Sequence, residues 1–91
     1  MSRHAHMHYV YTLQSRKDQS LYIGYTTDLK KRISRHNSGK NQATRPFRPY
    51  TLIFYEAFVN TRDAKSREKY LKSGWGRRTI KKMMRNYFRT E

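Results

Sequence analysis

The chain has 91 residues, which fits one domain around one small core, and its 21 Lys and Arg against 6 Asp and Glu give a formal net charge of +15. An excess of this size weakens a compact fold through self-repulsion, so it indicates an anionic partner, with nucleic acid as the leading candidate. The absence of cysteine excludes disulfides and thiolate metal sites, and no apolar run approaches the ~20 residues needed to span a bilayer. An anionic membrane surface and a charge excess that serves only solubility are the alternatives.

The same composition indicates the cellular compartment of the protein and the boundaries of its domain. A chain without cysteine and without an apolar signal segment is expected in the cytoplasm. The histidines at positions 4, 6 and 8 resemble a metal-binding tract. A disordered N-terminal extension or a remnant of cloning over residues 1–7 is the simpler interpretation, and it leaves residues 8–91 as one domain.

The first predicted elements are two strands. Residues 9–13 and 21–25 are rich in aromatic and β-branched side chains, and the turn-forming residues 15–20 lie between them, which predicts a β-hairpin. If the strands pair symmetrically about Arg16 and Lys17, Tyr11 lies opposite Tyr22 on one face, with Cβ atoms about 5 Å apart.

A helix is predicted next, from capping oxygens at residues 26–28 to a stop at Gly39. Spacings of three, four and seven residues predict that one face of this helix carries Leu29, Arg32, Ile33 and His36. That face combines apolar packing with a guanidinium and an imidazole. Solvated cations are expected on its other faces, namely Lys30, Lys31 and Arg35.

Residues 40–50 contain both prolines and no periodicity, so they predict an ordered loop that leads to a third strand. This strand, residues 51–58, is nearly continuous in apolar side chains. We therefore expect it to be the most buried strand of the sheet.

Two helices complete the chain. Asn60 followed by Asp63 resembles a capping box and opens a helix to about Lys72, on which Glu68 shares the apolar face. Gly-Trp-Gly at 74–76 predicts a break, and the last helix carries an apolar core stripe of Ile80, Met83, Met84, Tyr87 and Phe88. The order ββαβαα predicts an α+β fold with a small three-stranded antiparallel sheet flanked by helices.

Four of these elements carry side chains that phosphodiester hydrolysis requires. A proton acceptor for water, a cation for the negative charge of the transition state and a carboxylate for a divalent metal are all present if the helices pack near the hairpin. Asp18 lies in a turn, Asp28 and Asp63 lie at caps and Glu91 is terminal, so Glu56 and Glu68 remain for a site. A two-metal centre would need more carboxylates than these two, so one Mg²⁺ ion held by one carboxylate, substrate phosphate and waters is the more economical interpretation.

These residues make the sequence resemble the GIY-YIG nuclease superfamily. The resemblance rests on Tyr9-Val10-Tyr11 and Tyr22-Ile23-Gly24, continues through residues 29–33 and 36–39, and reaches the helix of Glu68. It covers roughly residues 8–78 and is greatest to the small single-domain bacterial branch. Each motif alone is weakly specific, whereas their order and spacing together are highly specific.

The resemblance implies a divalent-metal-dependent endonuclease with one Mg²⁺ or Mn²⁺ ion held by Glu68. It also implies that Tyr11 is the general base or orients water, that Tyr22 assists it and that Arg32 contacts the scissile phosphate. His36 matches a histidine that some members place beside the site. The chain departs from the family where Tyr9 replaces the usual first glycine and where Ile80 lies near the position of a common asparagine.

Simpler roles for the same residues stay open. The tyrosines would serve as packing, Arg32 and His36 as a solvated helix edge, and Glu68 as a salt-bridge partner of Arg32.

Nucleic-acid binding is expected to depend on phosphate contacts, because residues 29–49 and 69–90 contain no acid. The expected contact residues are Lys30, Arg35, Lys40, Arg45, Arg48, Arg77, Arg78, Lys81, Lys82 and Arg85. We expect a monomer that acts on DNA more than on RNA, with weak sequence specificity or structure selectivity and with no small-molecule cofactor. A non-catalytic DNA- or RNA-binding module that keeps the fold is the alternative.

Overall fold

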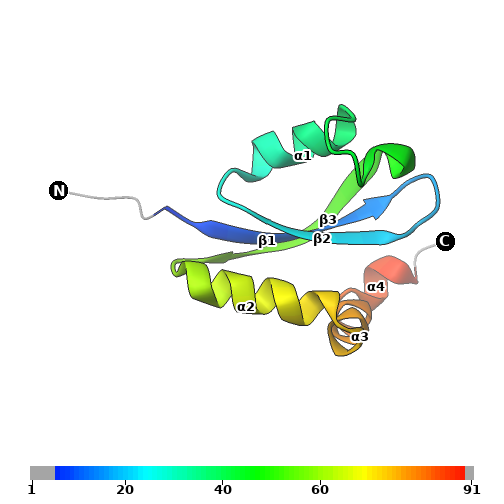
Figure 1. The fold of residues 1–91 in the computed structure, drawn as a ribbon. Coiled ribbons are helices and arrows are strands. Elements are labelled where there is room, and N and C mark those ends of the chain that lie inside the picture. The colour runs from blue at the N-terminus through cyan, green and yellow to red at the C-terminus, as the bar shows by residue number, and fades with distance from the viewer. Residues whose placement is uncertain (1–5, 90–91) are drawn as a thin grey trace.

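The computed structural model describes residues 6–89, which form a three-stranded antiparallel sheet with helices on both faces (Figure 1). Strand β1 (His8–Ser15) lies between β2 (Leu21–Thr26) and β3 (Tyr50–Phe58). Residues 1–5 of the expected N-terminal extension fall outside the described part of the chain.

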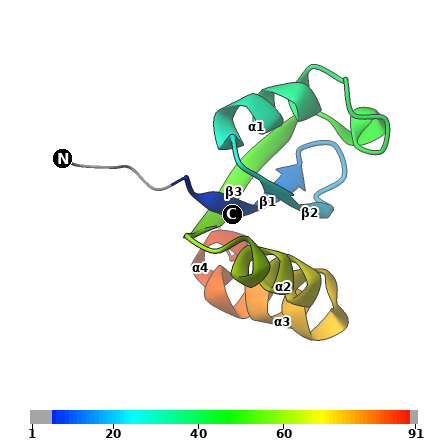
Figure 2. The same cartoon turned by 60° about the vertical axis from the view of Figure 1, so that its left-hand side comes forward.

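The helices divide between the two faces of the sheet (Figure 2). Helix α1 (Leu29–Asn37) covers one face, and α2 (Thr61–Lys72), α3 (Gly74–Met83) and α4 (Arg85–Phe88) lie on the other. This arrangement confirms the predicted α+β fold. No helix in residues 6–89 is long and apolar enough to cross a membrane.

The predicted hairpin is present, but its predicted register is wrong by two residues. Tyr11 pairs with Gly24, and Tyr22 pairs with Leu13. The turn is centred further along the chain than expected, because the Ser15 amide donates to the Ser20 carbonyl at 2.8 Å and Gln19 adopts a left-handed φ of 70°. A shift of two residues keeps side chains on the same face, so both tyrosines still face α1.

The most buried strand is β1, and the prediction that the third strand would be most buried is wrong. β1 is buried from Val10 to Ser15, because it pairs on both sides and is covered on both faces. β3 pairs only with β1, and its side chains at Tyr55 and Ala57 are exposed. A continuous apolar run therefore occurs here on an edge strand.

Each face of the sheet has its own core. On the α2 side, Val10 and Ile23 pack with Ala64, Leu71 and Ile80. The α1 side has a more aromatic core, built from Tyr11, Leu13 and Tyr50, with Tyr22, Leu29, Ile33 and Leu52 packed against it.

The predicted helix starts are confirmed by their caps. The Asp28 carboxylate accepts the amide of Lys31 at 3.1 Å, and the Asn60 side chain accepts the amide of Arg62 at 2.8 Å. In the loop between α1 and β3, residues Arg45–Phe47 form a short 3₁₀ turn.

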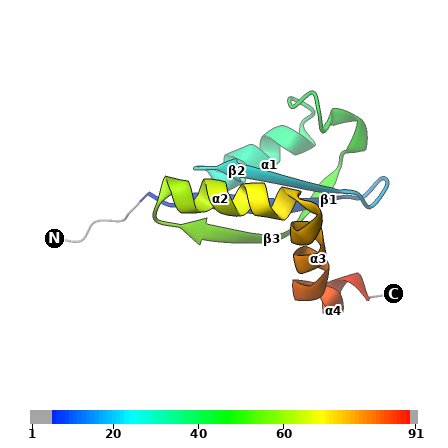
Figure 3. The ribbon, with the colours of Figure 1, turned by 60° about the horizontal axis from the view of Figure 1, so that its bottom comes forward.

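The expected break at residues 74–76 lies instead at Ser73, where the chain turns and α3 leaves α2 at a steep angle (Figure 3). The Ser73 hydroxyl accepts the Gly76 amide, so Gly-Trp-Gly forms the first turn of α3. The single last helix predicted from the sequence is also divided, because α4 begins at Arg85. Of the predicted core stripe, Ile80 is fully buried, whereas Met83 and Tyr87 are exposed.

Gly76 allows α3 to pack closely against the end of α2. A Cβ on Gly76 would collide with the backbone at Tyr70 and Leu71, and backbone atoms have little freedom to give way. A Cβ on the neighbouring Gly74 would meet no atom within 4 Å.

We therefore predict opposite effects of alanine at these two glycines. Gly76→Ala should lower the free energy of unfolding by about 1–3 kcal/mol, because it overpacks the α2–α3 corner. Gly74→Ala should leave it unchanged or raise it by up to about 1 kcal/mol, because alanine favours the helix. Urea denaturation followed by circular dichroism measures both, and equal effects would contradict the close packing at Gly76.

Candidate active site

Tyr11 lies at the centre of β1 with its side chain fully buried under α1. Its ring passes over Gly24 on the neighbouring strand, and a Cβ at Gly24 would occupy the space of the Tyr11 hydroxyl. The glycine of the Tyr22-Ile23-Gly24 motif is therefore required by the ring of Tyr11.

The Tyr11 hydroxyl is hydrogen-bonded to Nε2 of His36 at 2.9 Å, and both residues are fully buried. On the far side of the imidazole, Nδ1 lies 2.8 Å from the hydroxyl of Thr44, which itself donates to the Asn41 carbonyl at 3.4 Å. With the Thr44 hydroxyl donating to Asn41, its oxygen is left to accept a proton from Nδ1. This network assigns Nε2 of His36 as the acceptor of the Tyr11 hydroxyl proton.

Both partners of this hydrogen bond are neutral near pH 7. Burial raises the pKa of Tyr11 to about 12; the nearby Arg32 guanidinium opposes the rise, and the charges of Tyr22 and Glu68 add to it. Burial also lowers the pKa of His36, and the positive charges of Arg32 and Arg35 lower it further. Three side chains from three elements, Tyr22, Arg32 and Glu68, are thus close enough to influence Tyr11.

Tyr22 and Arg32 border the hydrogen-bonded pair. The Tyr22 ring meets His36 edge-on with centroids 5.0 Å apart, and its centroid lies 6.5 Å from that of Tyr11. Arg32 lies one turn before His36 on α1, and its Nη1 donates to the carbonyl of Tyr25 at 3.3 Å. The structure therefore brings together Tyr11, Tyr22, Arg32 and His36.

Glu68 on α2 supplies a carboxylate from the opposite side of the sheet. Its side chain is 17% exposed and pairs with Lys72 at 3.0 Å, so the salt bridge to Arg32 considered from the sequence is absent among residues 6–89. The alternative carboxylate, Glu56, is held by Arg67 through two hydrogen bonds of 2.8 and 3.1 Å. Of these two carboxylates, Glu68 is the one whose negative charge helps to raise the pKa of Tyr11.

The described residues hold no group of three or more His, Cys, Asp or Glu side chains that could enclose a metal ion. A single carboxylate suits Mg²⁺, which keeps several waters and is bound by one or two carboxylates together with substrate phosphate. The donor set around Glu68 therefore fits one such ion.

The predicted phosphate-contacting residues fall into two groups on opposite faces of the sheet (Figure 1). One group lies on α1 and the loop after it and comprises Lys30, Arg35, Lys40, Arg45 and Arg48. The other lies on α3 and α4 and comprises Arg77, Arg78, Lys81, Lys82 and Arg85. All ten are exposed, but Arg45 also donates to the Gly39 carbonyl at 2.7 Å and so helps to hold the loop.

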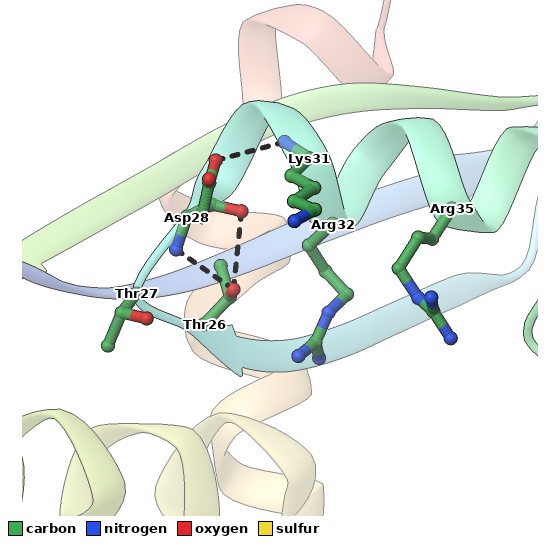
Figure 4. A pocket seen from close by; sticks show the side chains of 6 residues that line it. All are labelled: Thr26, Thr27, Asp28, Lys31, Arg32 and Arg35. Carbon is green, nitrogen blue, oxygen red and sulfur yellow. Dashed lines mark hydrogen bonds between the residues drawn. The ribbon is translucent and has the colours of Figure 1, made fainter.

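Arg35 was expected on a solvated side of α1, away from Arg32. It is exposed as expected, but it does not point away from Arg32. Both guanidiniums extend in the same direction over β2 and line one pocket of about 300 Å³ (Figure 4). The remaining lining residues are Thr26, Thr27, Asp28 and Lys31.

Trp75 is an exposed aromatic residue that no sequence pattern marked as functional. It is 70% exposed, and the Arg78 guanidinium lies over its ring at 4.9 Å. The exposed ring thus belongs to the cationic surface of α3. The only sequence signal was a tryptophan between two glycines, which also fits a simple helix break.

We predict that His36 makes the folded protein sensitive to acid. Because the pKa of His36 is lower in the folded protein than in the unfolded chain, the unfolded chain takes up the proton more readily. The free energy of unfolding should therefore fall as the pH drops below about 6.5, by at most about 1.4 kcal/mol per pH unit from this one proton. Denaturation at several pH values should give a shallower slope for His36→Gln, and equal slopes would contradict the prediction. Should that variant not fold, NMR titration of the His36 ring in the unaltered protein gives the same answer.

Comparison with known proteins shows which family this chain resembles. A family model described as the GIY-YIG catalytic domain matches residues 7–82. A UPF0213 protein of Clostridium perfringens is 49% identical over 67 residues, which span 72% of this chain and 71% of that protein. A UPF0213 protein of Bacillus pumilus is 46% identical over 74 residues, or 80% and 74% of the two chains. The solution NMR structure of a UPF0213 protein from Bacillus halodurans has a TM-score of 0.55 at 36% identity, covering 85% of this chain and 84% of that one. With the buried tyrosine, the glycine beneath its ring and the helix of Arg32 all in the matched segment, this chain belongs to the GIY-YIG family.

Proposed function

We propose that the protein is a divalent-metal-dependent endonuclease that hydrolyses phosphodiester bonds, in DNA more than in RNA, with weak sequence specificity or structure selectivity. The observation that carries the proposal is the buried Tyr11–His36 hydrogen bond, with Arg32 one helical turn before His36 and the charge of Glu68 within reach of Tyr11. Family membership adds support, and the net charge of +15 suits a polyanionic substrate.

In this proposal the proton of the attacking water moves to Tyr11 while the Tyr11 hydroxyl proton moves to Nε2 of His36. A tyrosine whose pKa is about 12 is a poor donor by itself, so it needs an acceptor already in contact, and His36 lies 2.9 Å away. Burial, together with the charges of Arg32 and Arg35, lowers the pKa of His36 and makes it a weak base in the free protein. Bound phosphate would offset these charges and make His36 more basic when the substrate is in place.

Arg32 and Glu68 have complementary roles in the proposal. The Arg32 guanidinium would contact the scissile phosphate, where a planar fork of donors stabilises the growing negative charge. Glu68 would hold one divalent cation, which supplies Lewis-acid stabilisation of that charge when bound. Lys72 would orient the Glu68 carboxylate through its ion pair.

A non-catalytic nucleic-acid-binding module is the second candidate function. Ile80, near the position where many family members carry an asparagine, is fully buried in the core with Ala64 and Leu71 and therefore cannot assist at the site. This observation favours a chain that binds strongly and turns over slowly or not at all.

The decisive experiment incubates the purified protein with branched, flapped, single-stranded and duplex substrates in Mg²⁺, Mn²⁺ or EDTA. We predict cleavage with a divalent ion and none in EDTA. Glu68→Gln should abolish cleavage, because it keeps the shape but removes the charge that holds the metal. Its binding should remain, and should weaken steeply as salt rises.

Glu56→Gln is the matched control for this experiment, because it removes a carboxylate that Arg67 already occupies. Glu56→Gln should still cleave the substrates. The variant should be less stable, because Arg67 loses its ion-pair partner. Full activity in Glu68→Gln would move the metal role elsewhere, and binding without cleavage under every condition would leave the binding module as the function.

Tyr11→Phe separates catalysis from packing, because it removes one oxygen and keeps the ring. We predict a 10² to 10⁴-fold loss in cleavage rate with little change in binding, as expected when a positioned proton acceptor is lost. Tyr50→Phe is the control, since Tyr50 is also buried with its ring centroid 6.1 Å from that of His36. Single-turnover rates measure both, and similar rates in the two variants would return Tyr11 to a packing role.

A further inference from the structure

We propose that the pocket in Figure 4 binds the phosphate next to the scissile one on the same strand, through Arg35 and Lys31. The proposal rests on the endonuclease function above, in which Arg32 contacts the scissile phosphate. It adds a second phosphate site, and it gives neighbouring cations of α1 different roles in substrate binding and in catalysis.

The spacing of the cations fits a strand backbone. Arg32 and Arg35 are three residues apart on α1, which puts their Cβ atoms about 5–6 Å apart on neighbouring positions of the helix surface. Their guanidiniums extend in the same direction across β2 (Figure 4). Two phosphates of one strand can therefore be contacted side by side from a single rigid helix.

The pocket also has the size and shape of a binding site. Its volume of about 300 Å³ exceeds what one phosphate group needs, so it has room for the attached sugar as well. Arg32 lines the pocket and also influences Tyr11, Arg35 lines it and reaches His36 through its charge, and Lys31 belongs to the pocket.

The cations of the pocket are uncompensated. Asp28 is the one acid in the lining, and its carboxylate accepts the Lys31 amide as the helix cap. Within residues 6–89, neither the Lys31 ammonium nor the Arg35 guanidinium has an ion-pair partner. Three cations against one engaged carboxylate leave a net positive site, which an anionic phosphate complements.

The arrangement separates substrate binding from catalysis. Arg35 and Lys31 would hold the neighbouring phosphate equally in the ground state and the transition state, so they improve binding. Arg32 would gain contact strength as charge builds on the scissile phosphate, so it improves the rate. Arg32→Lys should therefore bind nearly as well and cleave far more slowly, because an ammonium lacks the planar fork.

The test compares two thymidine oligonucleotides, TpT with one phosphate and TpTpT with two, by NMR titration of the unaltered protein in EDTA. Filling both phosphate sites should make TpTpT bind about tenfold more tightly than TpT, well above the factor of about two from statistics alone. The Arg Nε signals of Arg32 and Arg35 should both shift with TpTpT. In Arg35→Ala and in Lys31→Ala the gain should fall towards the statistical factor.

Arg62→Ala is the matched control, because Arg62 is an exposed arginine at the start of α2, on the other face of the sheet. It should keep the tenfold gain. Two results would overturn the second phosphate site. One is an affinity ratio of TpTpT to TpT of only about two in the unaltered protein, and the other is an equal ratio in Arg35→Ala and Arg62→Ala.

The results that would reject the endonuclease proposal differ from those that would reject the second phosphate site. Cleavage with a divalent ion together with no Arg35-dependent gain rejects the second site alone. An Arg35-dependent gain without cleavage of any substrate rejects the endonuclease alone and leaves a phosphate-binding module.

Discussion

The hydrogen bond from Tyr11 to His36 is the contact on which the other features of the site depend. It joins the central strand to α1, and each partner is fixed by a further constraint. The Tyr11 ring requires the bare backbone of Gly24, and the imidazole is held from behind by Thr44 in the loop after α1. A short motif in the hairpin, a helix and an irregular loop thus form one unit. Because both partners are fully buried, loss of either leaves a polar group without its partner in the core, at a cost of about 1–3 kcal/mol.

The large positive charge of the chain destabilises its fold through self-repulsion, and it favours the proposed binding of nucleic acid. The net charge of +15 is spread over both faces of the sheet, and in residues 6–89 only two ion pairs, Arg67–Glu56 and Lys72–Glu68, bring opposite charges into contact. A polyanion that binds only the folded chain stabilises it by mass action and also removes self-repulsion. Thermal stability should therefore depend more on salt and bound nucleic acid than in a neutral domain of the same size.

Local patterns predicted much of this fold. The starts of α1 and α2 could be read from Asp28 and Asn60, because a helix cap is decided by a few adjacent residues. The convergence of Tyr11, Tyr22, Arg32 and His36 was expected from motif order, and the structure brings these four side chains together. Glu68 was expected with them, but it lies on the helix across the sheet and is linked to Tyr11 through its charge. Their catalytic roles stay predictions.

The errors share a physical origin in tertiary context. The hairpin register depends on how Ser15 and Asp18 hold the turn, and the burial of each strand depends on which strand becomes central. The position of Arg35 has a different cause, because residues three apart on a helix are about 60° apart around its axis and therefore neighbours on its surface, so Arg35 and Arg32 reach one pocket. Glu68 meets Lys72 instead of Arg32 because the two helices lie on opposite faces of the sheet.

The exposure of Trp75 determines what optical measurements on this protein will report. It is the only tryptophan in the chain, and its indole is already 70% exposed in the folded state, so unfolding changes its surroundings little. Tryptophan emission is therefore a weak monitor of folding here, while circular dichroism follows the sheet and helices directly. The same indole, with Arg78 at 4.9 Å, responds instead to anything that settles on the first turn of α3. A base that stacks there would quench this single emitter, which makes the unlabelled protein its own sensor for ligands at that corner.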